Sequence, residues 1–211
     1  MQLKDWEGYQ IHLSWLNEQA EKAINLFSEI VQFDDETIET HLALGVLFRK
    51  QGKIDQAVKL HQNILLKKEL PEQHYYHALE ELAEDYYSAG LYDKSEELFI
   101  KLIDIKGHRI NSLNKLIQIY EFTCNWHEAI STLLLLNKLD SNNEYKNNES
   151  HYLCQIAENY IANKDFEQAN QYIDKAKQVN SKSERILFLS FQIELHRGNF
   201  DQATRLYKNL A

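Results

Sequence analysis

A short pattern that recurs six times along the chain constrains its fold more than any other feature. In each copy an apolar residue, two polar residues and a small residue are followed, four positions later, by a residue that is mostly large and apolar. The small residue, here called the anchor, lies at positions 23, 57, 95, 129, 169 and 203, so successive copies are 34, 38, 34, 40 and 34 residues apart. A period of about 34 residues is typical of arrays of helix–turn–helix units.

A second half of the pattern precedes the anchors and explains the spacing physically. Small residues at Gly45, Ala83 and Ala157 allow the first helix of a unit (helix A) to approach the second (helix B). Aromatic residues at positions 48, 86, 120 and 160 fill the space between adjacent units. One such pair cannot bury its apolar face alone, so the units must stack. We therefore predict an all-α, right-handed α-solenoid of tetratricopeptide repeats, with about six repeats in one array over residues 1–211 and an exposed loop over residues 139–150.

Composition excludes several other classes of protein. The chain of 211 residues has one proline and six glycines, too few turn residues for a sandwich or barrel of short strands. Its 23 Lys and Arg against 32 Asp and Glu give a formal charge of −9, which disfavours nucleic acid and anionic lipid as partners. Two cysteines exclude a disulfide framework, and no apolar run approaches a membrane span. We expect a cytoplasmic chain that does not insert into a membrane.

Three segments go beyond the general repeat pattern. They are His41–Gln62, Asp85–Phe99 and Leu116–Ile130, with the distinctive positions Arg49, His61, Gln62 and the turn Gly90–Asp93. In these segments the chain resembles the lipopolysaccharide assembly protein B family, and the resemblance extends from about residue 9 to the end of the sequence.

The resemblance implies a function and a location. The family combines an N-terminal membrane helix, a cytoplasmic repeat array and a C-terminal rubredoxin-like zinc ribbon, and we expect this chain to correspond to the array only. Family members act as adaptors that help a membrane-bound AAA protease to degrade the deacetylase of the lipid A pathway. The implied partners are therefore this deacetylase and this protease, at the cytoplasmic face of the bacterial inner membrane. The alternative is a general peptide-binding repeat module of another pathway, such as the non-catalytic arm of a glycosyltransferase.

The candidate binding surface follows from the repeat geometry, because the A helices of a solenoid line its concave face. The side chains that we expect there, and propose as partner contacts, are Arg49, Glu84, Tyr87, Gln118, Glu121, His151 and Glu158. The many carboxylates of this face favour a basic or mixed peptide segment over an anionic one.

The sequence offers no motif for catalysis, so we expect no enzymatic activity and no cofactor. It contains neither a phosphate-binding glycine loop nor a nucleophile elbow nor a zinc-protease motif. His151 and Cys154 stand three residues apart on one predicted helix, but two ligands do not make a zinc site, which needs three or four. We expect both to be ordinary surface residues and predict no metal site.

Overall fold

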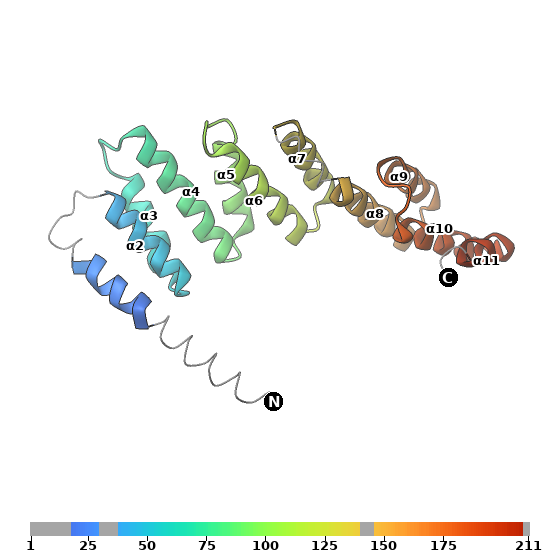
Figure 1. The fold of residues 1–211 in the computed structure, drawn as a ribbon, viewed down its shortest axis with the longest axis horizontal. Coiled ribbons are helices and arrows are strands. Elements are labelled where there is room, and N and C mark those ends of the chain that lie inside the picture. The colour runs from blue at the N-terminus through green and yellow to red at the C-terminus, as the bar shows by residue number, and fades with distance from the viewer. Residues whose placement is uncertain (1–17, 30–37, 140–145, 209–211) are drawn as a thin grey trace, which may run out of the picture. The chain divides into compact units, whose positions relative to one another are not determined.

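The structure of the chain is a computed structural model that describes residues 18–29, 38–139 and 146–208 (Figure 1). The described residues form α-helices joined by short turns and contain no β-strand, which confirms the all-α class. Residues 18–29 are helical. The helices that follow are α2 (Ile38–Lys50), α3 (Ile54–Leu65), α4 (Glu72–Ser88), α5 (Tyr92–Leu102), α6 (Arg109–Phe122), α7 (Trp126–Leu139), α8 (Lys146–Ala162), α9 (Phe166–Val179), α10 (Glu184–His196) and α11 (Phe200–Lys208).

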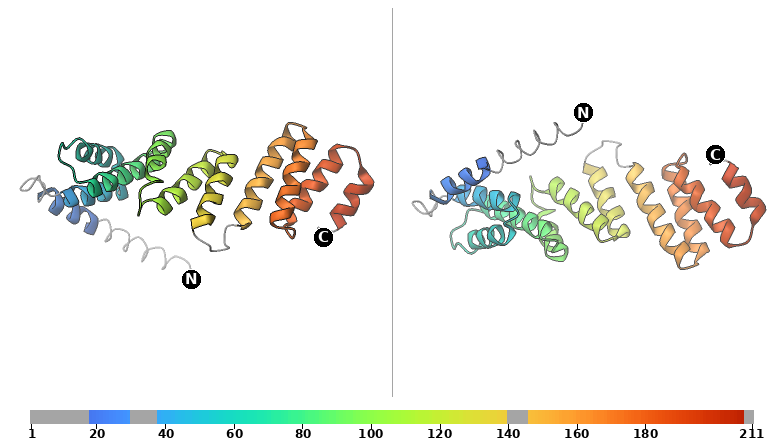
Figure 2. Two further views of the ribbon diagram at one scale, coloured as in Figure 1. Left: turned by 90° about the horizontal axis from the view of Figure 1, so that it is seen from above. Right: turned by 90° about the horizontal axis from the view of Figure 1, so that it is seen from below.

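The chain divides into two compact units, residues 1–112 and residues 113–211, and each is described by itself. From α2 onward the even-numbered helices are the A helices of the repeats and the odd-numbered ones are the B helices. In the first unit α2, α3, α4 and α5 pack against their neighbours in chain order, and α2 also packs against α4. In the second unit α7 to α11 pack in the same way, and α8 also packs against α10 (Figure 2). Adjacent A helices therefore lie side by side within a unit, as in a solenoid.

The repeat pattern accounts for the core. Among the anchors, Ala57, Ser95, Ala129 and Ala169 have no exposed surface, and Ala203 is 3% exposed. Opposite them on the A helices, the small residues at 45, 83 and 157 are buried as well. The one polar anchor is accommodated by a hydrogen bond, because its hydroxyl donates to the carbonyl oxygen of residue 83 at 2.9 Å. Small residues on both helices thus bring A and B into close contact.

Every described turn from an A helix to its B helix has the same backbone form. One residue in each turn adopts a positive φ: Gly52 (75°), Gly90 (72°), Cys124 (55°), Lys164 (61°) and Gly198 (78°). The next residue's N–H donates to the carbonyl five positions earlier, as from Lys53 to Phe48 and from Leu91 to Tyr86. This hydrogen bond closes the end of an α-helix through a left-handed residue.

The predicted exposed loop over residues 139–150 is too long. Helix α7 continues to Leu139, and α8 begins at Lys146, so the second part of the predicted loop is helical. The six residues between these helices, 140–145, lie outside the described residues. No helix in the described part of the chain is both long enough and apolar enough to span a lipid bilayer.

Candidate partner-binding surface

Arg49, predicted as a partner contact, connects two A helices of the first unit. Its guanidinium donates to Asp85 Oδ1 at 2.6 Å, to Glu81 Oε2 at 2.6 Å and to the Glu81 carbonyl oxygen at 3.1 Å. Only 14% of its side chain is exposed. Burial disfavours the charged guanidinium, but the hydrogen bonds to the two carboxylates outweigh this and raise the pKa of Arg49. Arg49 therefore holds α2 against α4.

The same Asp85 also contacts His61 of α3, which is buried within the first unit. Its imidazole has no exposed surface, and Nδ1–H donates to Asp85 Oδ2 at 2.6 Å. The ring lies directly over Gly45, where even a Cβ atom would clash with it. Asp85 is thus shared by Arg49 and His61 and joins three helices. A buried carboxylate needs such partners, because an unpaired buried charge is strongly destabilising.

Two further histidines bridge helices across the first unit. His74 Nε2 of α4 lies 2.8 Å from Glu39 Oε1 of α2. His108 Nδ1, just before α6, lies 2.8 Å from Glu80 Oε2 of α4. The first contact joins the A helices α2 and α4, and the second joins α4 to the turn that precedes α6. The first unit is therefore tied together by histidine–carboxylate contacts.

The remaining predicted contacts of the first unit lie near the end of α4. Glu84 and Tyr87 are both half-buried. The ring of Tyr87 meets that of Tyr92 edge-on, with centroids 5.7 Å apart. The aromatic contact spans the turn from α4 to α5, so Tyr87 is held in place while part of it remains accessible.

In the second unit an arginine that sequence reasoning missed organises the predicted residues. Arg185 of α10 donates to Glu158 Oε1 from Nε at 3.1 Å and from one terminal nitrogen at 2.8 Å. Its other terminal nitrogen donates to His151 Nδ1 at 2.7 Å. Burial and the positive charge of Arg185 lower the pKa of His151. His151 and Glu158, both on α8, are thus brought together by one guanidinium.

The last two predicted contacts lie on α6. Glu121 is exposed and accepts a hydrogen bond from the hydroxyl of Tyr152 of α8 at 2.5 Å. Burial, followed by this hydrogen bond, raises the pKa of Tyr152. Gln118, one helical turn earlier, is also exposed. Glu121 therefore joins α6 to α8, and Gln118 offers an amide to the solvent.

The prediction that Cys154 lies on the surface is wrong. Its side chain is 1% exposed and belongs to the apolar core formed by α8, α9 and α10. The reason is helical geometry: Cys154 stands three residues before the small Ala157, on the stripe of α8 that faces its neighbours. His151, by contrast, is exposed, so the two residues do not share a surface.

The ionic contacts between A helices have a spacing that sequence reasoning overlooked. Arg49 and Asp85 are 36 residues apart, Arg49 and Glu81 are 32, and Glu39 and His74 are 35. Equivalent positions of successive repeats stand about 34 residues apart and face one another across adjacent A helices. A search for opposite charges about one repeat apart on A helices would have found these contacts.

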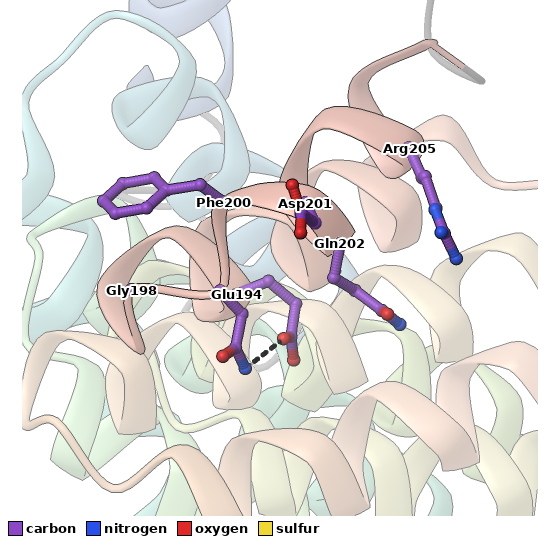
Figure 3. A pocket seen from close by; sticks show the side chains of 7 residues that line it. Glu194, Gly198, Phe200, Asp201, Gln202 and Arg205 are labelled. Atoms are coloured by element: carbon purple, nitrogen blue, oxygen red, sulfur yellow. Dashed lines mark hydrogen bonds between the residues drawn. The ribbon is translucent and has the colours of Figure 1, made fainter.

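An open recess of about 580 Å³ lies at the turn between α10 and α11 (Figure 3). Its lining is largely polar, and the Glu194 carboxylate accepts a hydrogen bond from the Asn199 amide at 2.8 Å. The side chains of Phe200 and Arg205 point away from each other. Nowhere in residues 18–29, 38–139 and 146–208 do three or more His, Cys, Asp or Glu side chains gather as metal ligands would.

Comparison with known families and structures identifies the class of protein. A tetratricopeptide repeat family model matches residues 40–74, which cover most of α2, all of α3 and the start of α4. The crystal structure of MamA superposes with a TM-score of 0.53 at 15% identity, covering 79% of this chain and 92% of that one. A structure of PilF from Pseudomonas aeruginosa gives a TM-score of 0.50 at 16% identity, covering 95% and 87%. The chain is a tetratricopeptide-repeat protein.

Sequence comparison then gives the family. Lipopolysaccharide assembly protein B of Escherichia coli K12 is 32% identical over 188 residues, which make up 89% of this chain and 48% of that protein. The protein of the same name from Haemophilus influenzae is 27% identical over 205 residues, 92% of this chain and 51% of that protein. The chain is related to lipopolysaccharide assembly protein B, which confirms the resemblance seen in the sequence, and it spans about half the length of these relatives. The repeat fold indicates a protein-interaction scaffold.

Proposed function

We propose that the chain is a non-enzymatic protein–protein interaction scaffold that holds protein partners on the exposed faces of its A helices. The observation that carries this proposal is the side-by-side packing of α2 with α4 and of α8 with α10. Such packing makes one continuous surface out of side chains that are a whole repeat apart in sequence. Solenoids use extended surfaces of this kind to bind other proteins.

As partners we propose the deacetylase of the lipid A pathway and a membrane-bound AAA protease, which the family resemblance implies. An adaptor must bring these two proteins together, and two compact units offer two surfaces for doing so. On this proposal the chain acts at the cytoplasmic face of the bacterial inner membrane. The two partners and this location rest on the family relationship.

The contact residues divide by role. We assign the main contacts to Tyr87 and His151, because partly accessible aromatic side chains lose little conformational entropy on binding. Arg49 and Glu158 take part mainly by holding adjacent A helices in register, since their charges are already paired. Glu84, Gln118 and Glu121 complete the surface as its polar edge.

The test compares alanine variants by titration with each purified partner. Tyr87→Ala and His151→Ala should each weaken binding of at least one partner by about tenfold or more. Tyr207→Ala and His127→Ala are matched controls: both residues are exposed, lie on B helices, and contact one aromatic neighbour, Phe191 and Tyr172 respectively. All four variants are first checked for unchanged helicity.

Two results would count against the proposal. If both folded A-helix variants bind as well as the wild type, the A-helix faces are not the binding surface. If the wild type binds neither protein, the named partners are wrong, and the chain is better described as a peptide-binding repeat module of another pathway.

A further inference from the structure

A small slot lies between α2 and α4 on the first unit. Four residues on one side of α2 line it: Glu39, and Leu42, Ala43 and Val46, which follow Glu39 by three, four and seven residues. His77 of α4 completes the lining. The slot has a volume of about 170 Å³. Sites for small molecules usually measure about 300–1,000 Å³. The slot therefore fits a single aliphatic side chain better than a free metabolite or a cofactor.

One carboxylate lines the slot and a second lies beside it. Glu39 belongs to the lining, and its side chain is 69% exposed and contacts the imidazole of His74. Glu81 does not line the slot but lies 3.6 Å from Nε2 of the lining residue His77. The nearby cation Arg49 is already bound to two carboxylates. An occupant that enters the slot thus meets negative charge that the solvent can reach, chiefly at Glu39.

The charge of the neighbouring helix has the same sign. Helix α4 contains neither lysine nor arginine and carries five acidic residues. Glu81 and Asp85 are paired with Arg49, and the other three are Glu72, Glu80 and Glu84. A surface of one sign attracts oppositely charged segments and repels like-charged ones. An aliphatic residue that approaches the slot is therefore favoured when its own chain carries Lys or Arg beside it.

We propose that this slot receives one aliphatic side chain of a partner protein, from a segment that places Lys or Arg next to it, against Glu39. The aliphatic group packs on Leu42, Ala43 and Val46, while the cation pairs with the Glu39 carboxylate and displaces or shares its contact with His74. This inference rests on the proposed function, since it assumes that the A-helix face binds protein segments. It adds a chemical rule for the segment in the first unit.

The experiment selects ligands without assuming the partner. A random peptide library displayed on phage is enriched on the immobilised chain at physiological salt. The enriched peptides should carry Leu, Ile, Val or Met beside Lys or Arg. A selected peptide is then labelled and titrated by fluorescence anisotropy, together with two altered forms: one with the aliphatic residue changed to Ser and one with the basic residue changed to Glu. Both altered forms should bind at least about fivefold more weakly.

Variants of the chain locate the binding. Glu39→Lys should weaken the selected peptide by about fivefold or more, and Ala43→Leu, which fills the slot from inside, should weaken it as much. The matched control is Glu97→Lys, because the Glu97 side chain is 68% exposed and likewise makes one surface ion pair, with Lys101. This control should leave the affinity within about twofold. If Ala43→Leu lowers helicity, the comparison of Glu39→Lys with Glu97→Lys still decides.

Several outcomes would overturn the inference: enriched peptides without the aliphatic–basic pattern, an affinity that Glu39→Lys leaves unchanged, or an equal loss with Glu97→Lys. These outcomes are separate from failure of the proposed function. If the deacetylase or the protease binds while no patterned peptide does, the slot inference falls alone. If patterned peptides bind at the slot while neither protein binds, the slot inference holds and the named partners are wrong.

Discussion

Replacing Gly45 by alanine tests the packing at the centre of the first unit. In an ordinary helix this change is stabilising by about 1 kcal/mol, because glycine is the poorer helix former. Here a Cβ on residue 45 would lie 2.6 Å from Cε1 and 2.9 Å from Cδ2 of His61, with Nε2 closer still. Contacts under 3 Å require the ring to move, but it is fully buried and hydrogen-bonded to Asp85 at 2.6 Å.

The magnitude follows from these opposing terms. Overpacking a core typically costs about 1–3 kcal/mol, and a displaced ring also weakens the contact with a buried carboxylate. We expect a net loss of about 1–3 kcal/mol in the free energy of unfolding. With an m value of about 2 kcal/mol/M, the urea midpoint followed by circular dichroism should fall by about 0.5–1.5 M.

A double-mutant cycle isolates the clash. In a His61→Ala background the ring is absent, so Gly45→Ala should be neutral or stabilising by up to about 1 kcal/mol. If Gly45→Ala leaves the otherwise unchanged chain as stable as the wild type, or destabilises both backgrounds equally, the clash with His61 does not govern stability at this position.

Three further predictions concern the second unit. Lys164 holds a left-handed backbone conformation at φ 61°, so Lys164→Gly should raise the free energy of unfolding by about 0.5–1 kcal/mol and with it the urea midpoint, and an unchanged or lower midpoint would contradict this. Cys154 is buried and burial raises its pKa, so mass spectrometry should show iodoacetamide labelling exposed Cys124 much faster; equal rates would show that Cys154 is accessible. Burial and Arg185 lower the pKa of His151 in the folded chain. Because His151 then binds a proton more readily in the unfolded chain, its contribution to stability should fall as pH drops through about 6.5. In an NMR titration Arg185→Met should raise the pKa of His151, and no change would remove the guanidinium as a cause.

The fold could be predicted because small residues recur at fixed positions of the repeat, where two helices are in close contact. Ala57 and Ala129 mark where a B helix must approach its A helix, and the structure buries both completely. The left-handed residues of the turns could be predicted only in part. Glycine at position 52 signals a left-handed residue, whereas Cys124 and Lys164 adopt the same conformation without the residue type that favours it.

The candidate surface could be predicted less well. The period places residues on A helices, but it does not say which of them pair with one another. The pairing of Arg49 with Asp85 and Glu81 was not predicted, because such pairing depends on distances between helices that a one-dimensional pattern does not contain. Cys154 was expected on the surface together with His151, three residues earlier, yet it lies in the apolar core beside Ala157, which stands three residues after it.

Hydrogen exchange with mass spectrometry shows whether partners bind the exposed faces of the A helices. The chain is measured alone and saturated with the lipid A pathway deacetylase, and the exchange of each helix is compared. If partners bind these faces, exchange should slow in α2 and α4, in α8 and α10, or in both pairs, while the B helices α3, α5 and α9 change little. Protection confined to the B helices, or to the turns between helices, would contradict it.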